Sequence, residues 1–361
     1  MAGELVEQIR MDYAPDKRTA VFDIQIRDST PLGITGTTNL PQARAALLAG
    51  LRKRDIKVKE EIELLPHTAL GENIFGLINL SVANMRSRSA YNAELVTQAL
   101  LGTPVNILLK KDDWYLVQTP DRYIAWITTA SLVPMSAQKI KDWKKASKII
   151  YINTYGHALG PDLKNRVSDL VAGDVLQLHG ESAAYWMVTF PDGREARIAR
   201  KEAKKLPDWI ANITVSDSSM VRMATSLMGV PYLWGGTSVK GVDCSGFTKT
   251  VFLMHGYVLP RDASQQVFAG QLVDSVGNFS QHRVGDLLFF GRKNEDGSER
   301  VIHVGLWIGD QQFIHAAGDV HISSIDSLQP HYDRYNHQRY LRTRRLIGID
   351  DPLIAKLAEI Y

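Results

Sequence analysis

The stretch PYLWGGTSVKGVDCSGF, Pro231–Phe247, carries the strongest structural signal in the sequence. Asp243 is a residue type that begins helices, because its carboxylate can accept a hydrogen bond from an unpaired N–H of the first turn. Apolar residues then recur at helical spacing from Phe247 to Met254, and Gly256 can end the helix. Cys244 is therefore predicted in the first turn of a helix whose other face is buried.

This position predicts that Cys244 is a nucleophile. Unpaired N–H groups and the helix dipole at a helix N-terminus favour the thiolate, which attacks carbonyl carbon. Gly235 and Gly236 leave room for a substrate to approach. Cys244 is the sole cysteine of the sequence, so no intramolecular disulfide is possible. A lone cysteine is most often buried packing, but packing explains neither the cap nor the glycine-rich approach.

Two of the ten histidines are placed to assist a thiol. His303 begins the strand-like run VGLWI, His315 ends QFI, and Gly309-Asp310 between them is typical of a hairpin. Positions twelve apart share a face if the loop has three or five residues, and lie on opposite faces if it has two. We expect the odd loop, with His303 as general base and His315 orienting its ring. One cysteine and two strand histidines make a poor zinc site, so we expect no metal and no cofactor.

Upstream of this region the sequence predicts two small β-barrels. Short runs rich in aromatic and β-branched residues, separated by turn residues, occur at Val105–Leu109, Trp114–Gln118 and Tyr123–Ile127, and again at Val175–Leu178, Tyr185–Phe190 and Glu195–Ile198. The phrases WYLVQTPD from Trp114 and WMVTFPDG from Trp186 form a weak repeat, with a period of about 72 residues. We interpret the two sets as two copies of one barrel.

Four segments follow from these patterns. Pro41 can open a helix with apolar residues at helical spacing, so residues 1–65 are predicted to be an N-terminal helical cap. Residues 66–138 and 139–208 are the two barrels. Serine caps after Asp208 begin an α+β domain, residues 209–361, which holds all the predicted chemistry.

Composition excludes several classes of function. A formal charge of +3 over 361 residues, without a basic patch interleaved with aromatics, gives no reason to expect nucleic acid as a partner. No apolar run approaches 18 residues, so no transmembrane segment is predicted. The first residues lack the features of a signal peptide, and the compartment stays open between the cytoplasm and a cell envelope reached through a removed signal.

The C-terminal motifs together resemble the NlpC/p60 family of cell-wall cysteine peptidases, over about residues 220–347. The matching pieces are Pro231–Gly236, Asp243–Phe247, Pro260–Gln266 (PRDASQQ), Val284–Leu287, His303–Gly305 and His315-Ala316. The resemblance implies a papain-like α+β fold with the triad Cys244, His303 and His315. It also implies that Tyr232 lies beside the nucleophile, near the oxyanion site.

The upstream region is similar to the paired bacterial SH3-like domains of one subgroup, the γ-D-glutamyl-L-diamino acid endopeptidases. Resemblance to that subgroup implies that Glu94 and Tyr123 of the first barrel, with Asp262, hold the free amine of an N-terminal L-Ala. Asp243 and Ser245 would line the substrate site. The usual glycine before that tyrosine is Arg122 here, which could alter the charge of the pocket.

The expected protein is a monomeric cysteine peptidase that cleaves peptidoglycan peptides of the form L-Ala-γ-D-Glu-diamino acid. Two alternatives stay open at this stage. One is a cell-wall binding protein whose SH3-like pair anchors a degenerate catalytic domain. The other is an amidase or acyltransferase on the same fold, which the acidic amine pocket disfavours because a lipid substrate would need an apolar groove.

Overall fold

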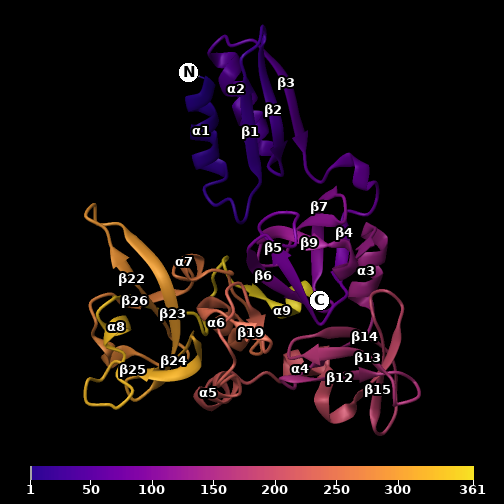
Figure 1. The fold of residues 1–361 in the computed structure, drawn as a ribbon, viewed down its shortest axis with the longest axis vertical. Coiled ribbons are helices and arrows are strands. Elements are labelled where there is room, and N and C mark those ends of the chain that lie inside the picture. The colour runs from indigo at the N-terminus through magenta and orange to yellow at the C-terminus, as the bar shows by residue number, and fades with distance from the viewer. Residues whose placement is uncertain (1) are drawn as a thin grey trace.

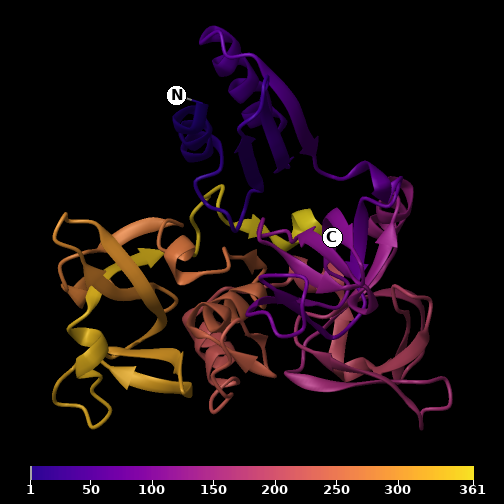
Figure 2. The same ribbon diagram turned by 45° about the horizontal axis from the view of Figure 1, so that its top comes forward.

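Residues 2–361, which the computed structural model describes, form four consecutive units (Figures 1 and 2). In both views the N-terminal unit (indigo) stands at the top, the two barrels (magenta to pink) lie below it on one side, and the C-terminal sheet (orange to yellow) lies on the other. Helix α6 (Cys244–Leu253) lies between the barrels and that sheet.

The N-terminal unit is an α/β structure, so the prediction of a helical cap for residues 1–65 was wrong. Its elements are α1 (Ala2–Tyr13), β1 (Phe22–Arg27), β2 (Leu32–Thr38), α2 (Pro41–Lys53) and β3 (Val58–Leu64). The predicted helix at Pro41 is confirmed as α2. The sheet has the order β1-β2-β3, with β2 and β3 parallel because α2 makes the crossover between them. The apolar–polar alternation of Phe22–Arg27 was the overlooked strand signal.

The two predicted barrels are present as two seven-stranded sheets. The first contains β4 (Phe75–Ile78), β5 (Val82–Arg86), β6 (Leu95–Leu100), β7 (Pro104–Lys111), β8 (Trp114–Gln118), β9 (Ile124–Thr128) and β10 (Leu132–Met135). Helix α3 (Ala137–Lys145) leads to the second, with β11 (Lys148–Tyr151), β12 (Tyr155–Leu159), β13 (Arg166–Val171), β14 (Val175–Glu181), β15 (Tyr185–Thr189), β16 (Glu195–Ala199) and β17 (Ala203–Lys205). All six predicted strands are confirmed within one or two residues at most ends.

Sheet topology confirms that the barrels are copies. The strand order is β10-β4-β7-β8-β9-β5-β6 in the first and, read from the other edge, β17-β11-β14-β15-β16-β12-β13 in the second. Each strand of one order corresponds to the strand seven places later in the other. The repeated phrases lie on the equivalent central strands β8 and β15, starting at the first residue of β8 and the second of β15.

The C-terminal domain places helices against one antiparallel sheet. After α4 (Leu206–Ala211) and α5 (Asp217–Thr225) come β18 (Thr237–Ser238), β19 (Gly241–Val242), α6, β20 (Tyr257–Val258) and α7 (Ala263–Gln266). The six-stranded sheet has the order β21-β26-β22-β23-β24-β25, formed by Gln271–Asp274, Tyr340–Arg345, Leu287–Lys293, Glu299–Gly309, Gln312–Ala317 and Asp319–Ser324. Helix α8 (Arg334–His337), β27 (Ala355–Lys356) and α9 (Leu357–Ile360) complete the chain.

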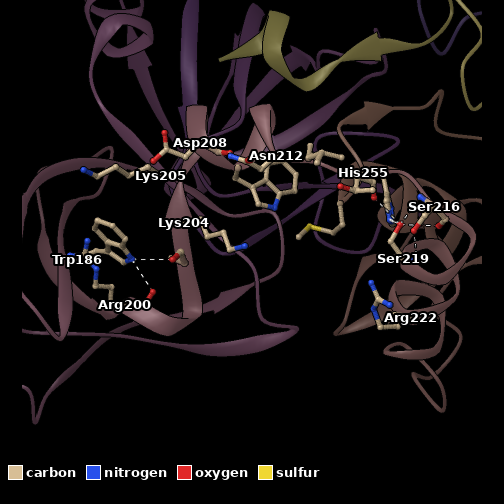
Figure 3. Close-up of a pocket in the computed structure, with 15 residues that line it drawn as sticks. Trp186, Arg200, Lys204, Lys205, Asp208, Asn212, Ser216, Ser219, Arg222 and His255 are labelled. Carbon is tan, nitrogen blue, oxygen red and sulfur yellow. Dashed lines mark hydrogen bonds between the residues drawn. The ribbon is translucent and has the colours of Figure 1, made fainter.

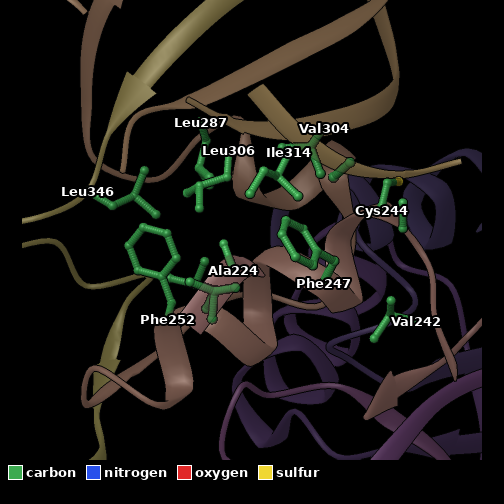
Figure 4. Packing of buried hydrophobic residues seen from close by; sticks show 14 of the residues in the cluster. Ala224, Val242, Cys244, Phe247, Phe252, Leu287, Val304, Leu306, Ile314 and Leu346 are labelled. Carbon is green, nitrogen blue, oxygen red and sulfur yellow. The ribbon is translucent and has the colours of Figure 1, made fainter. Parts of the chain in front are cut away.

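Helix α6 is positioned by its apolar face, which packs against β23 and β24 (Figure 4). Phe247 and Val251 are fully buried in one cluster with Leu306 and Ile314 of the sheet. Cys244 lies at the edge of this core. The packing therefore holds the predicted nucleophile at a constant position relative to β23.

The first barrel contacts both the second barrel and the C-terminal domain. Leu101, just after β6, is buried within the core of the second barrel, and the N–H of Val175 donates to its carbonyl at 3.0 Å. Asp121 of the β8–β9 turn forms a largely buried ion pair with Lys249 of α6, at 2.7 Å.

The helices of residues 2–361 are all too short or too polar to span a membrane.

We predict that Leu101→Ala lowers the free energy of unfolding by about 2–5 kcal/mol, because it leaves a cavity in a core shared by two barrels. Urea unfolding followed by tryptophan fluorescence is the measurement. Leu328→Ala is the matched control, since Leu328 is 90% exposed and its loss should change stability by no more than about 0.5 kcal/mol. Equal stability of the two variants would mean that the barrels do not share a core.

Candidate active site

The turn before α6 is held by the side chain of Asp243, which caps the helix as predicted. Its Oδ1 accepts the N–H of Gly246 at 2.7 Å and its Oδ2 accepts the N–H of Gly235 at 2.9 Å. Both glycines are required by close backbone contacts. A Cβ on Gly246 would lie 1.9 Å from the carbonyl oxygen of Gly236. Gly235 has a φ of +81°, which favours glycine, and it lies directly against the carbonyl of Leu95.

A buried arginine, Arg261, pairs with the same carboxylate. Its Nη2 and Nη1 lie 2.6 Å and 3.1 Å from the Oδ2 and Oδ1 of Asp243, and Nη1 also donates to Ser245 Oγ at 2.9 Å. Its Nε donates to Thr97 Oγ1 of the first barrel at 3.0 Å. The predicted site residues Asp243 and Ser245 thus have partners within the protein. Arg261 was not among the predicted site residues, although it stands in the quoted PRDASQQ motif beside Asp262.

The thiol of Cys244 does not have the low pKa that its helix position led us to expect. Burial, followed by the charge of Asp243, raises its pKa to about 12, against the opposing effect of the backbone N–H groups of Val304 and Ser245. The expectation of a resting thiolate was therefore wrong. Burial is the larger of the two effects that oppose the helix N-terminus, and the negative charge of the capping carboxylate adds to it.

The hairpin between β23 and β24 has a two-residue loop, Asp310-Gln311, so the expected odd loop was also wrong. Both residues have positive φ, 48° and 58°, as type I′ turns require. The pairing shifts at Ile308: Trp307 pairs with Phe313, but Gly309 pairs with Gln312. This bulge adds one unpaired residue, so that positions twelve apart lie on the same face of the sheet, as they would with an odd-numbered loop.

His303 and His315 consequently share one face, as predicted. His303 Nε2 and His315 Nδ1 are 2.7 Å apart, and His315 Nε2 is 3.0 Å from Ser323 Oγ on β25. The carboxylate of Asp333 lies 4.0 Å from His315. Ser323 and Asp333 were missed, because only the β24–β25 register and the fold of the following loop bring them to His315.

Both imidazoles are neutral in this environment. Burial, then the positive charge of Arg339, lowers the pKa of His303 to about 4. Burial, then His303 itself, lowers the pKa of His315 to about 3. The thiol faces the backbone of Val304, the residue after His303, so a neutral thiol and a neutral base lie on adjacent elements.

Tyr232 lies within electrostatic reach of the thiol. Burial, followed by electrostatic interaction with Cys244 and Asp243, raises its pKa. Its backbone bridges to Val242 and its N–H donates to the carbonyl of Gly318 at 2.8 Å. The structure therefore places Tyr232 beside the nucleophile turn, where the resemblance put it.

The three residues predicted to bind an amine lie where the first barrel meets the C-terminal domain. Glu94 accepts the indole N–H of the exposed Trp234 at 2.8 Å. Tyr123 is buried, and its pKa is raised by burial and then by the charge of Asp262. Asp262 also contacts Arg18 of the N-terminal unit at 2.7 Å, a partner that no sequence pattern indicated.

A separate cavity of about 790 Å³ lies between the second barrel and α5 (Figure 3). Trp186, Arg200 and Lys204 line one side, and Arg222 and His255 line the other. None of the predicted site residues borders this cavity.

Comparisons with known proteins agree with this geometry. The NlpC/P60 family profile matches residues 229–345, and that of the bacterial dipeptidyl-peptidase Sh3 domain matches residues 85–132. A γ-D-glutamyl-L-lysine dipeptidyl-peptidase of Bacillus cereus is 32% identical over 238 residues, which are 62% of this chain and 67% of that protein. Dipeptidyl-peptidase 6 of Lysinibacillus sphaericus is 26% identical over 70% of this chain and 92% of its own length.

The fold is shared with a solved structure. The crystal structure of an NlpC/P60 family protein from Bacillus cereus superimposes with a TM-score of 0.65 at 24% identity, over 76% of this chain and all of the other. Similarity of sequence over two thirds of a relative, together with this architecture, leads to one assignment: the chain belongs to the NlpC/P60 family of cysteine peptidases.

Proposed function

We propose that this peptidase hydrolyses the bond between the γ-carboxyl of D-Glu and the diamino acid in peptidoglycan peptides that begin with a free L-Ala. The observation that carries the proposal is the junction of the first barrel with the catalytic domain, where Glu94, Tyr123 and Asp262 lie close to the nucleophile turn. The names of two relatives, a γ-D-glutamyl-L-lysine dipeptidyl-peptidase and a dipeptidyl-peptidase, support the same substrate class.

Cys244 is the proposed nucleophile and His303 its base. His303 Nε2 is engaged by His315, so Nδ1 is the nitrogen left to accept the thiol proton. If Ser323 accepts from His315 Nε2, then His315 Nδ1 accepts from His303, and the tautomer with a free Nδ1 lone pair is the stable one. His315 therefore acts as the orienting residue, and Asp333 stabilises the positive charge that develops on the pair.

The reaction then proceeds in two acyl transfers. As the sulfur of Cys244 bonds to the γ-carbonyl carbon, the thiol proton passes to His303, because thiol and imidazole are both neutral at rest. His303 returns that proton to the nitrogen of the departing diamino acid, leaving a thioester. Water, deprotonated by His303, cleaves the thioester and regenerates the thiol. The N–H of Cys244 lies outside the helical hydrogen-bond ladder and, with Tyr232, is the proposed oxyanion donor.

Asp243 and Ser245 are proposed to line the substrate side of this turn. Their oxygens are held by Arg261 and by glycine N–H groups, so their main effect is to position the nucleophile. An amidase or acyltransferase would release or use a different acyl group, and the mass of the products separates these reactions.

We predict that Cys244→Ser reduces turnover more than about 1,000-fold, because a serine hydroxyl at this position does not readily lose its proton to form the nucleophilic anion. His303→Ala should lose about 100- to 10,000-fold. His315→Ala should lose less, since the base itself is kept. Steady-state rates on L-Ala-γ-D-Glu-diaminopimelate, with melting curves as a folding control, are the measurements; a greater loss in His315→Ala than in His303→Ala would reverse the assigned roles.

We predict that alkylation of Cys244 by iodoacetamide accelerates continuously from about pH 6 to about pH 10, since the raised thiol pKa and the lowered pKa of His303 disfavour a preformed ion pair. Cys244→Ser is the control, because the sequence contains no other thiol. A rate plateau between about pH 5 and pH 8 would show that a thiolate–imidazolium pair exists at rest.

We predict that acetylating the L-Ala amine lowers kcat/KM by roughly thirtyfold or more. The ammonium group would lose its pairing with the carboxylates of Glu94 and Asp262, which are exposed and half-buried in the free protein and which bound substrate would cover, and losing a covered charge pair costs about 2–5 kcal/mol. Glu94→Gln should lose much of this discrimination while Cys244 is alkylated normally. Glu72→Gln, an exposed acid of the first barrel, is the control. Equal cleavage of free and acetylated peptides by the wild type would contradict the proposed substrate. Whole peptidoglycan would then be the substrate to test.

A further inference from the structure

The segment between α1 and β1 joins the N-terminal unit to both domains that form the proposed amine site. The N–H of Ile124, at the start of β9, donates to the carbonyl of Arg18 at 2.7 Å. The side chain of Gln118 donates to the carbonyl of Thr19 at 3.1 Å. Arg18 is thereby held beside Tyr123, the neighbour of Ile124 in the chain.

The guanidinium of Arg18 reaches from this anchor into the catalytic domain. Its Nη1 donates to Asp262 Oδ2 at 2.7 Å and to Ser264 Oγ at 2.9 Å. Its Nε and Nη2 donate to the two oxygens of Asp16, each at 2.8 Å. Gln265 donates to Asp16 Oδ2 at 2.8 Å and closes the network. Four hydrogen bonds to three partners define the position of the guanidinium.

Within residues 2–361, Oδ1 of Asp262 has no cation at hydrogen-bond distance. Oδ2 is taken by Arg18, whereas the closest cation to Oδ1, Nη1 of Arg261, is 3.9 Å away and beyond hydrogen-bond distance. Arg18 and Arg261 are each paired with a second carboxylate, Asp16 and Asp243. The charges of these five groups therefore sum to −1, which a substrate ammonium group would neutralise.

We propose that Arg18 is a specificity-determining residue: by holding Oδ2 of Asp262 it presents Oδ1 to the free ammonium group of the peptide substrate. This inference rests on the proposed function and extends it to the N-terminal unit. Residues 1–84 lie outside both family matches, so this contact is supplied by a part of the chain that the family profiles do not describe. Arg18 acts through Asp262 and is a positioning residue.

The test compares Arg18→Ala and Arg18→Lys with Arg44→Ala. Arg44 is the matched control because its ion pair with Glu60 lies wholly within the N-terminal unit. The side chains of Arg44 and Glu60 are 32% and 23% exposed, and those of Arg18 and Asp262 are 32% and 27% exposed. The substrates are free and N-acetylated L-Ala-γ-D-Glu-diaminopimelate. Melting curves establish that each variant is folded.

For Arg18→Ala we expect KM for the free peptide to rise roughly three- to tenfold, a range set by the partial exposure of the pair. The kcat and the rate on acetylated peptide should stay within about twofold, so selectivity for the free amine falls. Arg18→Lys should restore part of it, and Arg44→Ala should behave as the wild type.

The pH profile provides a readout that an interface contact alone would not move. Burial raises the pKa of Asp262, while Arg261 and Arg18 oppose the rise. Asp243, Asp16 and Tyr123 are the other ionisable groups around it. Removing Arg18 should therefore raise the Asp262 pKa further, and the acid limb of kcat/KM for the free peptide should move to higher pH.

Two outcomes would overturn the inference, and a third would refute the proposed function on which it rests. Unchanged selectivity in a folded Arg18→Ala variant would make the pair an interface contact only. Faster cleavage of the free peptide by that variant would mean that Arg18 competes with the substrate for Asp262. Failure of the wild type to cleave either peptide would instead refute the proposed function, which separates the two hypotheses.

Discussion

The buried ion pair between Arg261 and Asp243 is the contact on which the rest of the site depends. Arg261 is 1% exposed, and removing either partner of such a pair typically costs about 3–5 kcal/mol, because the other charge is left buried and unpaired. Asp243 can cap α6 and bind the loop glycine only if an arginine balances its charge. Burial raises the pKa of the Cys244 thiol and the same anion adds to that rise, so the group that positions the nucleophile also favours its protonated form.

Through Arg261 this pair also determines where the first barrel lies. The Nε of Arg261 donates to Thr97 on β6. The side chain of the neighbouring Gln98 accepts the N–H of Thr237 at 2.9 Å. Close approach of the Leu95 carbonyl to Gly235 completes the contact. A domain held by buried hydrogen bonds next to a catalytic turn can contribute binding groups with little loss of conformational entropy on substrate binding. The N-terminal unit adds Arg18 to this arrangement from a third direction, so the proposed specificity is a property of three units together.

Two expectations about local geometry were wrong for related reasons. Loop length between His303 and His315 was inferred from parity alone, but parity can also be supplied by a β-bulge. The bulge at Ile308 is followed by Gly309, whose φ is +97°, and this glycine was interpreted only as part of the turn. A thiolate was inferred from the helix dipole alone, but the burial of Cys244 and the charge of its own cap act in the opposite direction. In each case the inference used one local effect, and the fold contained a second one: the β-bulge for the histidines, and burial with the Asp243 charge for the thiol.

The sequence alone determined the barrels and the capped helix of Cys244, because turn residues, apolar periodicity and capping residues act over a few neighbouring positions. The shared face of the two histidines was predicted correctly, but it results from the β-bulge at Ile308 and not from the expected loop. It also contained the signal for strand β1, in the alternation of Phe22–Arg27, which we had not used. Only the tertiary structure decided that Arg261 pairs with Asp243, that Ser323 supports His315 and that Arg18 reaches Asp262. Those contacts join residues 18, 8 and 244 positions apart. They depend on how whole domains and strands pack, and no local pattern of residues encodes the distance between side chains that far apart.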